Sequence, residues 1–384
     1  MDKPTKDQNM NRRSFFKGLG AAALGAAAAS GKPVFPAASF GCASQRCLSP
    51  SRNPPNRGDL SAKGNPESSA GVSAGRERWR SSVDIKVNPA FAQCFVDYCE
   101  HPDPEIKNKL LAHPALGALV RHRLMTTGRR PERKHLLEQL LSSCAQASGA
   151  RQVLAGWKNS RDEKRPSLFS AAAEALRYLP PKTKLAGTLF LVVNYDIGIP
   201  APPDAALNVG HPHFVHNVDE LAPYTTHEFH HVGFLAHRSF PGLDGMHCRE
   251  KLQSLIDYFT QLEGMAVHAA FPIRRRHGWL ENDEDYRVYT DPKFADKVIS
   301  RYHQVCKQVR LHDTISQENA GKALTALSSG ERLWYRMGAL TSWSIEKNQG
   351  RKRLVDSIRR PGIFRQELDR LTDKNRNSPQ TGLI

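Results

Sequence analysis

Apolar residues recur at helical spacing through much of the segment between residues 83 and 185. Leu136, Leu137, Leu140 and Leu141 are one example, with Lys, Arg and Glu residues around them. Side chains three and four positions apart share one face of a helix, so this pattern predicts amphipathic helices. We expect a helical lobe here that forms one wall of a cleft.

A different pattern begins at Thr188. Residues 188–195 read Thr-Leu-Phe-Leu-Val-Val-Asn-Tyr and are followed by a Gly- and Pro-rich stretch at 198–203. A short run of β-branched and aromatic residues between such breakers predicts a buried strand. Further short strands are predicted at 205–209 and 214–218. Helical periodicity returns beyond Thr225, at 229–237, 252–271, 294–309 and 332–347. The predicted fold is α+β, mostly helical with a small sheet.

The N-terminal segment has the pattern of an export signal. Residues 11–17 read Asn-Arg-Arg-Ser-Phe-Phe-Lys, and a weakly apolar run of Gly, Ala and Leu follows at 18–29. This resembles a twin-arginine signal, which would be recognised by the twin-arginine translocation machinery. The apolar run is shorter than the roughly 20 residues that a spanning helix needs. We therefore expect a signal peptide at 1–38, no stable membrane span after its removal, and a periplasmic or secreted mature protein.

Residues 39–84 are rich in Ser, Pro, Gly, Asn and Arg and contain few large apolar side chains. Such a segment buries too little surface to order itself, so it is predicted to be a disordered linker. The folded part then comprises the helical lobe at 85–187 and a catalytic part at 188–375, together forming one combined domain.

The chain is strongly basic, with a formal net charge of +17, of which the first 40 residues supply only four charges. Such a balance suits nucleic acid, anionic lipid or an acidic cell-wall polymer. No basic stretch with interleaved aromatic residues resembles a nucleic-acid module, so we expect a solvated basic surface and no nucleic-acid partner. None of the seven cysteines forms a CxxC pair, and disulfides are optional additions rather than a framework.

The sequence His227-Glu228-Phe229-His230-His231 is an HExxH motif. On a helix, the first and last of these His residues lie about 40° apart and one turn apart, so both can bind one ion. Neutral imidazoles suit Zn²⁺, and Glu228 can take a proton from a metal-activated water and pass it to a leaving amine. The motif therefore predicts a hydrolytic zinc site.

A catalytic zinc needs a third protein ligand, and three residues compete for this role. Glu263 lies in Leu-Glu-Gly-Met-Ala-Val, beside an apolar helical stripe and small residues. Glu250 follows His231 after 18 intervening residues and has charged neighbours. His237 occupies the third-ligand position of a metzincin pattern. That pattern would require Gly at position 234, where Phe234 stands. Glu263 is the leading assignment, with Glu250 and His237 as alternatives.

From about Thr188 to Ile358 the chain resembles predicted zinc-dependent peptidases of the gluzincin type, which pair His-Glu-x-His-His with a downstream Glu-Gly-x-Ala. The resemblance implies a zincin-like fold, a zinc cofactor held by His227, His231 and Glu263, and hydrolysis of a peptide or protein substrate with Glu228 as general base and acid. Val267 departs from it, since some gluzincins have Asp four residues after the ligand Glu. No exopeptidase amine-binding motif is recognisable.

Other residues are candidates for supporting roles. Tyr335 is a candidate donor to the oxyanion of the tetrahedral intermediate. His211, His213 and His216 are candidates to line the cleft, and His230 flanks the ligand pair. Each of these side chains has an equally ordinary explanation in packing or solvation.

Two other functions remain open at the level of sequence. One is a non-catalytic cell-envelope protein that binds zinc structurally or binds a polymer through its basic surface. The other is a different zinc hydrolase, acting for example on cell-wall peptides or amides. Loss of hydrolysis on substitution of Glu228 would separate the peptidase from the non-catalytic protein.

Overall fold

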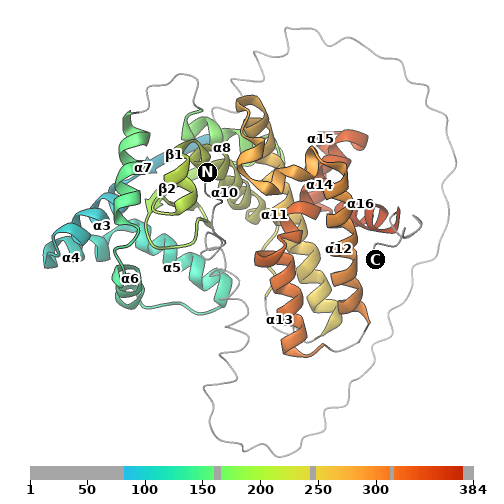
Figure 1. Cartoon of the computed structure of the whole chain (residues 1–384), viewed down its shortest axis with the longest axis horizontal. Helices are drawn as coiled ribbons and strands as arrows, with labels where there is room; N and C mark the ends of the chain where they lie inside the picture. The colour runs from blue at the N-terminus through green and yellow to red at the C-terminus, as the bar shows by residue number, and fades with distance from the viewer. Residues whose placement is uncertain (1–81, 160–165, 243–247, 312–314, 375–384) are drawn as a thin grey trace, which may run out of the picture.

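The computed structural model describes residues 82–159, 166–242, 248–311 and 315–374. Two groups of elements lie side by side: the sheet with helices α3–α10, and the helices α11–α16 (Figure 1). The fold is α+β and mostly helical, with a small four-stranded mixed sheet. The predicted signal at 1–38 and nearly all of the predicted linker lie outside the described residues.

The sheet has the strand order β1-β2-β4-β3. Its strands are β1 (Val83–Asn88), β2 (Leu185–Val192), β3 (Gly198–Ala201) and β4 (Asp204–Asn208). The β1–β2 and β2–β4 pairs are parallel, whereas β3 is antiparallel to β4 and forms one edge. The C-terminal half of β2 is buried throughout, because helices cover both faces of the sheet.

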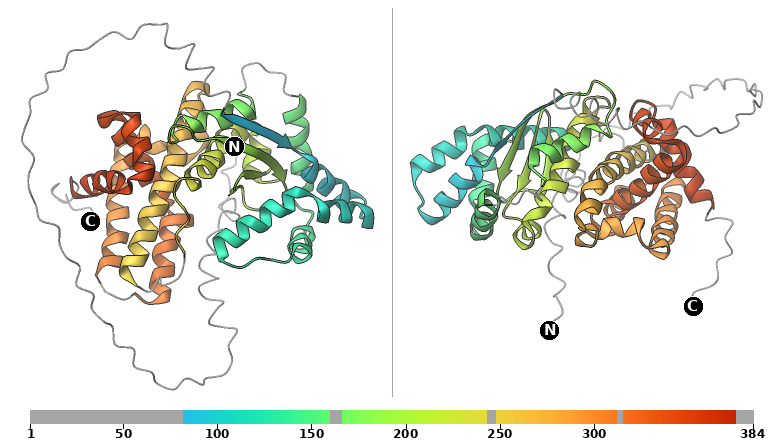
Figure 2. Two further views of the ribbon diagram at one scale, coloured as in Figure 1. Left: turned by 180° about the vertical axis from the view of Figure 1, so that it is seen from behind. Right: turned by 90° about the horizontal axis from the view of Figure 1, so that it is seen from above.

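Six helices connect β1 to β2: α3 (Ala90–Glu100), α4 (Pro104–Ala112), α5 (Pro114–Thr127), α6 (Arg133–Leu141), α7 (Ala147–Asn159) and α8 (Leu168–Leu176). Helices α3 and α5 pack on one face of the sheet, while α8 and α10 (Leu221–Leu235) pack on the other (Figure 2). Between β4 and α10 lie the short helix α9 (Pro212–His216) and the turn η2 (Val218–Glu220). Helix α10 therefore lies between the sheet and the second group of helices.

The second group begins with the long helix α11 (Arg249–His277). It continues through η3 (Leu280–Asn282), η4 (Glu284–Tyr289), α12 (Pro292–Arg310), α13 (Gln317–Thr325), the π-turn η5 (Ala326–Gly330), α14 (Leu333–Gln349), α15 (Arg351–Arg359) and α16 (Pro361–Lys374). Helices α11 and α14 meet backbone to backbone, since a Cβ built on Gly338 would lie only 2.7 Å from the Cα of Gly264. Gly264 therefore lets α11 approach α14 closely. Because Gly264 follows Glu263, the sequence had instead suggested a close approach of α11 to the helix of His227 and His231.

Three local predictions are wrong. Residues 83–88 form β1 rather than part of a helix, so Val83 and Asp84 belong to the sheet and not to the linker. Residues 214–218 fall in α9 and η2 instead of a strand, because Pro212 starts a helix that the His211 side chain caps. Residues 198–201 form the edge strand β3, where Pro200 is tolerated because an edge strand needs fewer ladder donors.

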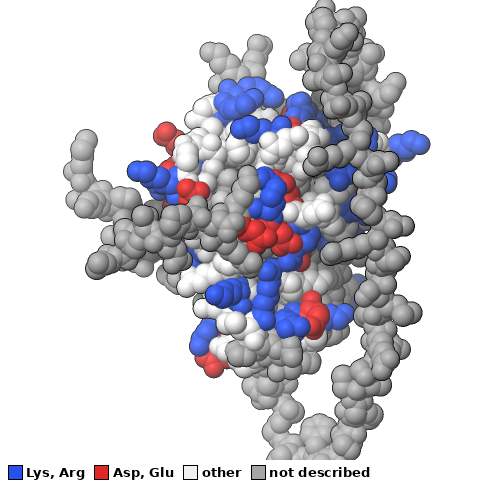
Figure 3. Space-filling view, turned by 90° about the vertical axis from the view of Figure 1, so that its right-hand side faces the viewer, with Lys and Arg blue, Asp and Glu red and all other residues white. Residues whose placement is uncertain are grey.

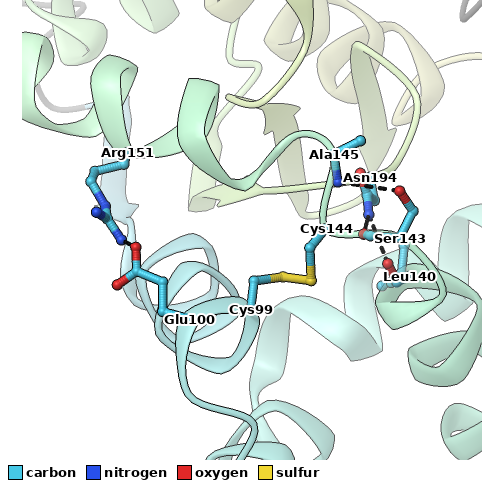
Figure 4. Close-up of a disulfide and its surroundings, with 8 residues drawn as sticks. All are labelled: Cys99, Glu100, Leu140, Ser143, Cys144, Ala145, Arg151 and Asn194. Atoms are coloured by element: carbon cyan, nitrogen blue, oxygen red, sulfur yellow. Dashed lines mark hydrogen bonds and ion pairs between the residues drawn. A yellow bond between two sulfur atoms is a disulfide. The ribbon is translucent and has the colours of Figure 1, made fainter.

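One disulfide, between Cys99 and Cys144, crosslinks the end of α3 to the connection between α6 and α7 (Figure 4). The same connection holds the segment that follows β2. Asn194, at a φ of 59°, donates from Nδ2 to the carbonyl oxygens of Leu140, at 2.8 Å, and Ser143. The disulfide and these hydrogen bonds together fix the loop that leads into β3.

The basic residues do not form a single stripe on the face shown in Figure 3, where they are scattered among acidic side chains. This distribution fits a solvated basic surface better than a track for nucleic acid. Within the described ranges, no helix combines the length and apolar character needed to cross a bilayer.

Candidate metal centre

Helix α10 presents two histidines to the cleft between the two groups of helices. His227 and His231 are one helical turn apart, and their Nε2 atoms are 2.9 Å apart. The ring centroids are 4.5 Å apart and the rings are nearly perpendicular. Because the rest of α10 is buried against the sheet and α8, the backbone that carries this pair is rigidly placed.

Glu263 on α11 completes a triangle of donor atoms. Its Oε2 lies 3.3 Å from Nε2 of His227 and 3.2 Å from Nε2 of His231. In a tetrahedral zinc site with bonds of about 2.0–2.1 Å, neighbouring donor atoms are about 3.3–3.4 Å apart. The three observed separations are close to this value, so the donor set and its spacing both fit Zn²⁺ with one position left open.

The charges within the triangle also favour a cation. Burial alone would raise the pKa of Glu263, but His231 and His227 hold it well below its usual range. Burial alone would lower the pKa of His231, and the Glu263 carboxylate raises it instead. An anionic oxygen is therefore buried beside two imidazole nitrogens, and a divalent cation would satisfy all three.

A buried ion pair fixes α10 relative to α11. The two terminal guanidinium nitrogens of Arg274 on α11, Nη1 and Nη2, donate to the carboxylate of Glu220, just before α10, including an Nη1–Oε1 bond of 2.8 Å. His213 and Asn282 also contact this carboxylate, at 2.9 and 3.2 Å. Burial tends to raise the pKa of Glu220, yet these partners lower it overall. The pair stays ionised and holds together the two helices that carry the triangle.

A second network fixes α11 relative to α14. His268, one and a half turns beyond Glu263, has its Nε2 2.5 Å from Oε2 of Glu346 and its Nδ1 3.1 Å from the hydroxyl of Tyr289. Arg351 also donates to Glu346 at 2.7 Å. Burial favours the neutral form of Glu346, but His268 and Arg351 lower its pKa to about 2. This network connects the helix of Glu263 to the helix that bears Tyr335.

Glu228 lies beside the triangle and against the edge strand. A Cβ built on Gly198 of β3 would lie 2.9 Å from Cδ and 3.1 Å from Cγ of Glu228, and closer still to Oε1. The carboxylate is nearly buried and lines the same cleft as both histidines. Only glycine at 198 leaves room for Glu228 in this position.

Tyr335 forms the wall of the cleft opposite β3. Its ring is nearly parallel to that of His227, with centroids 6.3 Å apart. The guanidinium carbon of Arg332 lies 3.7 Å from the centre of the Tyr335 ring, and Nε of Arg332 donates to both oxygens of Asp285 at 2.9 and 2.8 Å. Arg332 has a φ of 52°, directly after the π-turn, a strained arrangement often found at functional sites.

The two alternative third ligands lie elsewhere. Glu250 is exposed at the start of α11, where Cys248 and Arg249 donate to it and lower its pKa to about 2. His237 contacts Thr183 at 2.7 Å and Arg359 at 3.2 Å, outside the cleft. Among the described residues, the three donors brought together are those of His227, His231 and Glu263.

The other histidines that the sequence offered as candidates do not line the cleft. His211 caps α9, His213 contacts Glu220, and His216 ends the same short helix. His230 is fully buried behind the ligand pair, and burial lowers its pKa well below the usual value.

The cleft also contains residues that the sequence did not single out. Arg332 and Asp285 form one such pair, and Asp196 lies near Gly198 at the other wall. Apolar Ile197 and Ile199 alternate with their neighbours, and this is the one local signal that would have placed Asp196 on the side away from the core. No protein-family model, curated protein or solved structure matches this chain.

Proposed function

We propose that the protein is a zinc-dependent peptidase. The observation that carries this proposal is the triangle of His227, His231 and Glu263 donor atoms, 2.9–3.3 Å apart, at the bottom of a cleft that Glu228 also lines. A site with three protein donors and an open side is typical of catalytic zinc, whereas structural zinc is usually held by four. The proposal includes a zincin-like fold, in which the helix that carries the metal ligands lies beside an edge strand.

The chemistry divides between the ion and the chain. Bound zinc would supply a Lewis acid that polarises a carbonyl and makes water a stronger acid. Glu228 accepts the proton of the attacking water and delivers it to the leaving amine. Its contact with Gly198 holds the carboxylate beside the triangle, so the base does not have to be ordered during the reaction.

Tyr335 is placed to assist from the opposite wall. Its ring contacts the Arg332 guanidinium and is nearly parallel to the His227 imidazole, which restricts its position beside the triangle. We assign its hydroxyl as a donor to the oxygen that becomes negative in the transition state. The proposal also includes export by the twin-arginine route, because residues 11–17 have the pattern of that signal. The metal would then be bound before translocation.

Glu228→Gln tests the proposed reaction directly. The amide keeps the size of the side chain but cannot accept the proton, so we expect full zinc content and loss of peptide hydrolysis by at least about 100-fold. Glu250→Gln, at an exposed position on α11, is the matched control and should behave like the wild type. Hydrolysis by Glu228→Gln at the wild-type rate would refute the role of Glu228, and a wild-type protein with zinc but no hydrolysis would favour the non-catalytic alternative.

A further inference from the structure

The strand that borders the metal centre turns alternate residues toward the cleft. Ile197 and Ile199 point into the core, with exposed fractions of 8% and 1%. Successive side chains of an extended strand lie on opposite faces, so Gly198 and Pro200 of β3 share the face opposite Ile199, and Asp196 lies two residues before the strand begins. Asp196, Gly198 and Pro200 all line the cleft that contains His227 and His231. Asp196 is thus a charged residue of the cleft, two positions before the glycine that Glu228 contacts.

The acidic side chains of this cleft differ in whether a cation already neutralises them. Asp285 binds Arg332, Asp283 lies 3.6 Å from Arg274, and Glu263 is paired with the imidazoles. Asp196 has no hydrogen bond or ion pair with any described residue. Its nearest cationic influence is Arg123, whose Nε instead donates to the Tyr195 hydroxyl at 3.1 Å.

An acidic group in this position is unfavourable for the free protein. Burial raises the pKa of Asp196 to about 6, and Arg123 offsets this only in part. Near neutral pH the carboxylate is mostly ionised and only partly solvated. A partly buried charge without a partner weakens the fold, and such residues occur where a ligand supplies the missing charge.

We propose that Asp196 binds a positively charged group of the substrate, either a free amino terminus or a Lys side chain. Asp196 and Gly198 are two residues apart, which is a span of at most about 7 Å of extended chain. Because Glu228 packs against Gly198, the cation lies roughly two residues of extended peptide from the bond that is cleaved. The two arginines of the cleft are already paired with carboxylates and so do not oppose a cationic ligand. This inference rests on the proposed peptidase function and adds a preference for cationic substrates.

Four versions of one internally quenched peptide test this role: with and without N-terminal acetylation, and with either Lys or norleucine near the N-terminus. Binding is measured by calorimetry in the Glu228→Gln background, and kcat/KM in the wild-type background. We expect removal of the relevant cation to weaken binding and kcat/KM about 10- to 100-fold. Loss on acetylation identifies the amino terminus as the ligand, and loss with norleucine identifies the side chain.

Asp196→Asn should abolish this discrimination, whereas Asp84→Asn, exposed on β1 at the opposite edge of the sheet, should preserve it. Asp196→Asn should also unfold at the same or a higher temperature than the wild type, which a structural role for Asp196 would not allow. The inference is refuted if Asp196→Asn discriminates like the wild type, if it unfolds at a clearly lower temperature, or if none of the four peptides binds. If the peptidase proposal itself is wrong, the result is different: the peptides bind, but the zinc-loaded wild type does not hydrolyse them.

Discussion

Gly198→Ala should separate catalysis from folding and metal binding. A Cβ at this position would lie 2.9 Å from Cδ and 3.1 Å from Cγ of Glu228, whereas ordinary van der Waals contact begins near 3.4 Å. The backbone of β3 is fixed by its pairing with β4, so the Glu228 side chain must move, by about 0.5–1 Å. Misplacement of a catalytic group by about 1 Å costs up to about 100-fold in rate, so we expect kcat to fall about 10- to 100-fold, or about 1.4–2.7 kcal/mol.

The same substitution should leave stability nearly unchanged. The atoms in conflict belong to the end of a long side chain, and the φ of Gly198 is one that alanine can adopt. We expect the free energy of unfolding to change by less than about 1 kcal/mol, since the entropic gain of replacing Gly offsets part of the contact. Zinc content should equal that of the wild type, because the three atoms nearest to the added methyl group all belong to Glu228, which is not one of the proposed zinc ligands.

The assay compares zinc content, unfolding temperature and kcat for the wild type, Gly198→Ala and Gly156→Ala. Gly156 lies on α7 with nothing within 4 Å of an added Cβ, so its variant should have wild-type activity. Wild-type kcat for Gly198→Ala would refute the assigned position of Glu228. Loss of zinc from Gly198→Ala would instead place Gly198 in the metal site itself.

Three further predictions concern the disulfide, pH and export. Cys99→Ser with Cys144→Ser opens a crosslink between residues 45 positions apart, so chemical denaturation should reveal a loss of about 2–4 kcal/mol, while Cys94→Ser on the same helix should have little effect. With a folded-state pKa of about 6, above its ordinary value of 3.8, Asp196 destabilises the native state increasingly as pH rises from about 3.8 to about 6 and by a constant amount above that, while His122, with a pKa of about 3, stays neutral. The wild-type preference for cationic peptides should therefore be present at pH 7 and absent at pH 4.5, and a pH-independent preference would contradict this. The stability advantage of Asp196→Asn should be full at pH 7 and clearly smaller at pH 4.5. Replacing Arg12 and Arg13 together by Lys should leave the protein in the cytoplasm, and normal recovery outside the cytoplasm would contradict a twin-arginine signal.

The sequence predicted the long helices of the second group because their apolar positions recur over several turns. Residues 252–271 and 294–309, for example, fall within α11 and α12. The short strands were harder. The alternation of apolar and polar residues at 83–88 is a strand pattern, but it is only six residues long and runs directly into helical periodicity, and the Gly and Pro residues of β3 are typical of turns. Their place in the sheet depends on partners up to about a hundred residues away.

The candidate site was predictable only where a motif exists. His227, Glu228 and His231 follow from one helical turn, and Glu263 from its resemblance to a second short motif. Arg332 and Asp196 belong to no motif, because their positions result from a strained backbone after a π-turn and from an edge strand beside the cleft. The contact of Gly264 with α14 likewise depends on a helix more than seventy residues further along the chain.

The zinc content of purified protein, measured by mass spectrometry of the metal, tests whether His227, His231 and Glu263 bind zinc. We expect about one zinc ion per chain in the wild type and in Glu250→Ala and His237→Ala, and severe loss of zinc in Glu263→Ala. A wild-type protein that takes up no zinc, or a Glu263→Ala variant that retains a full equivalent, would contradict this assignment.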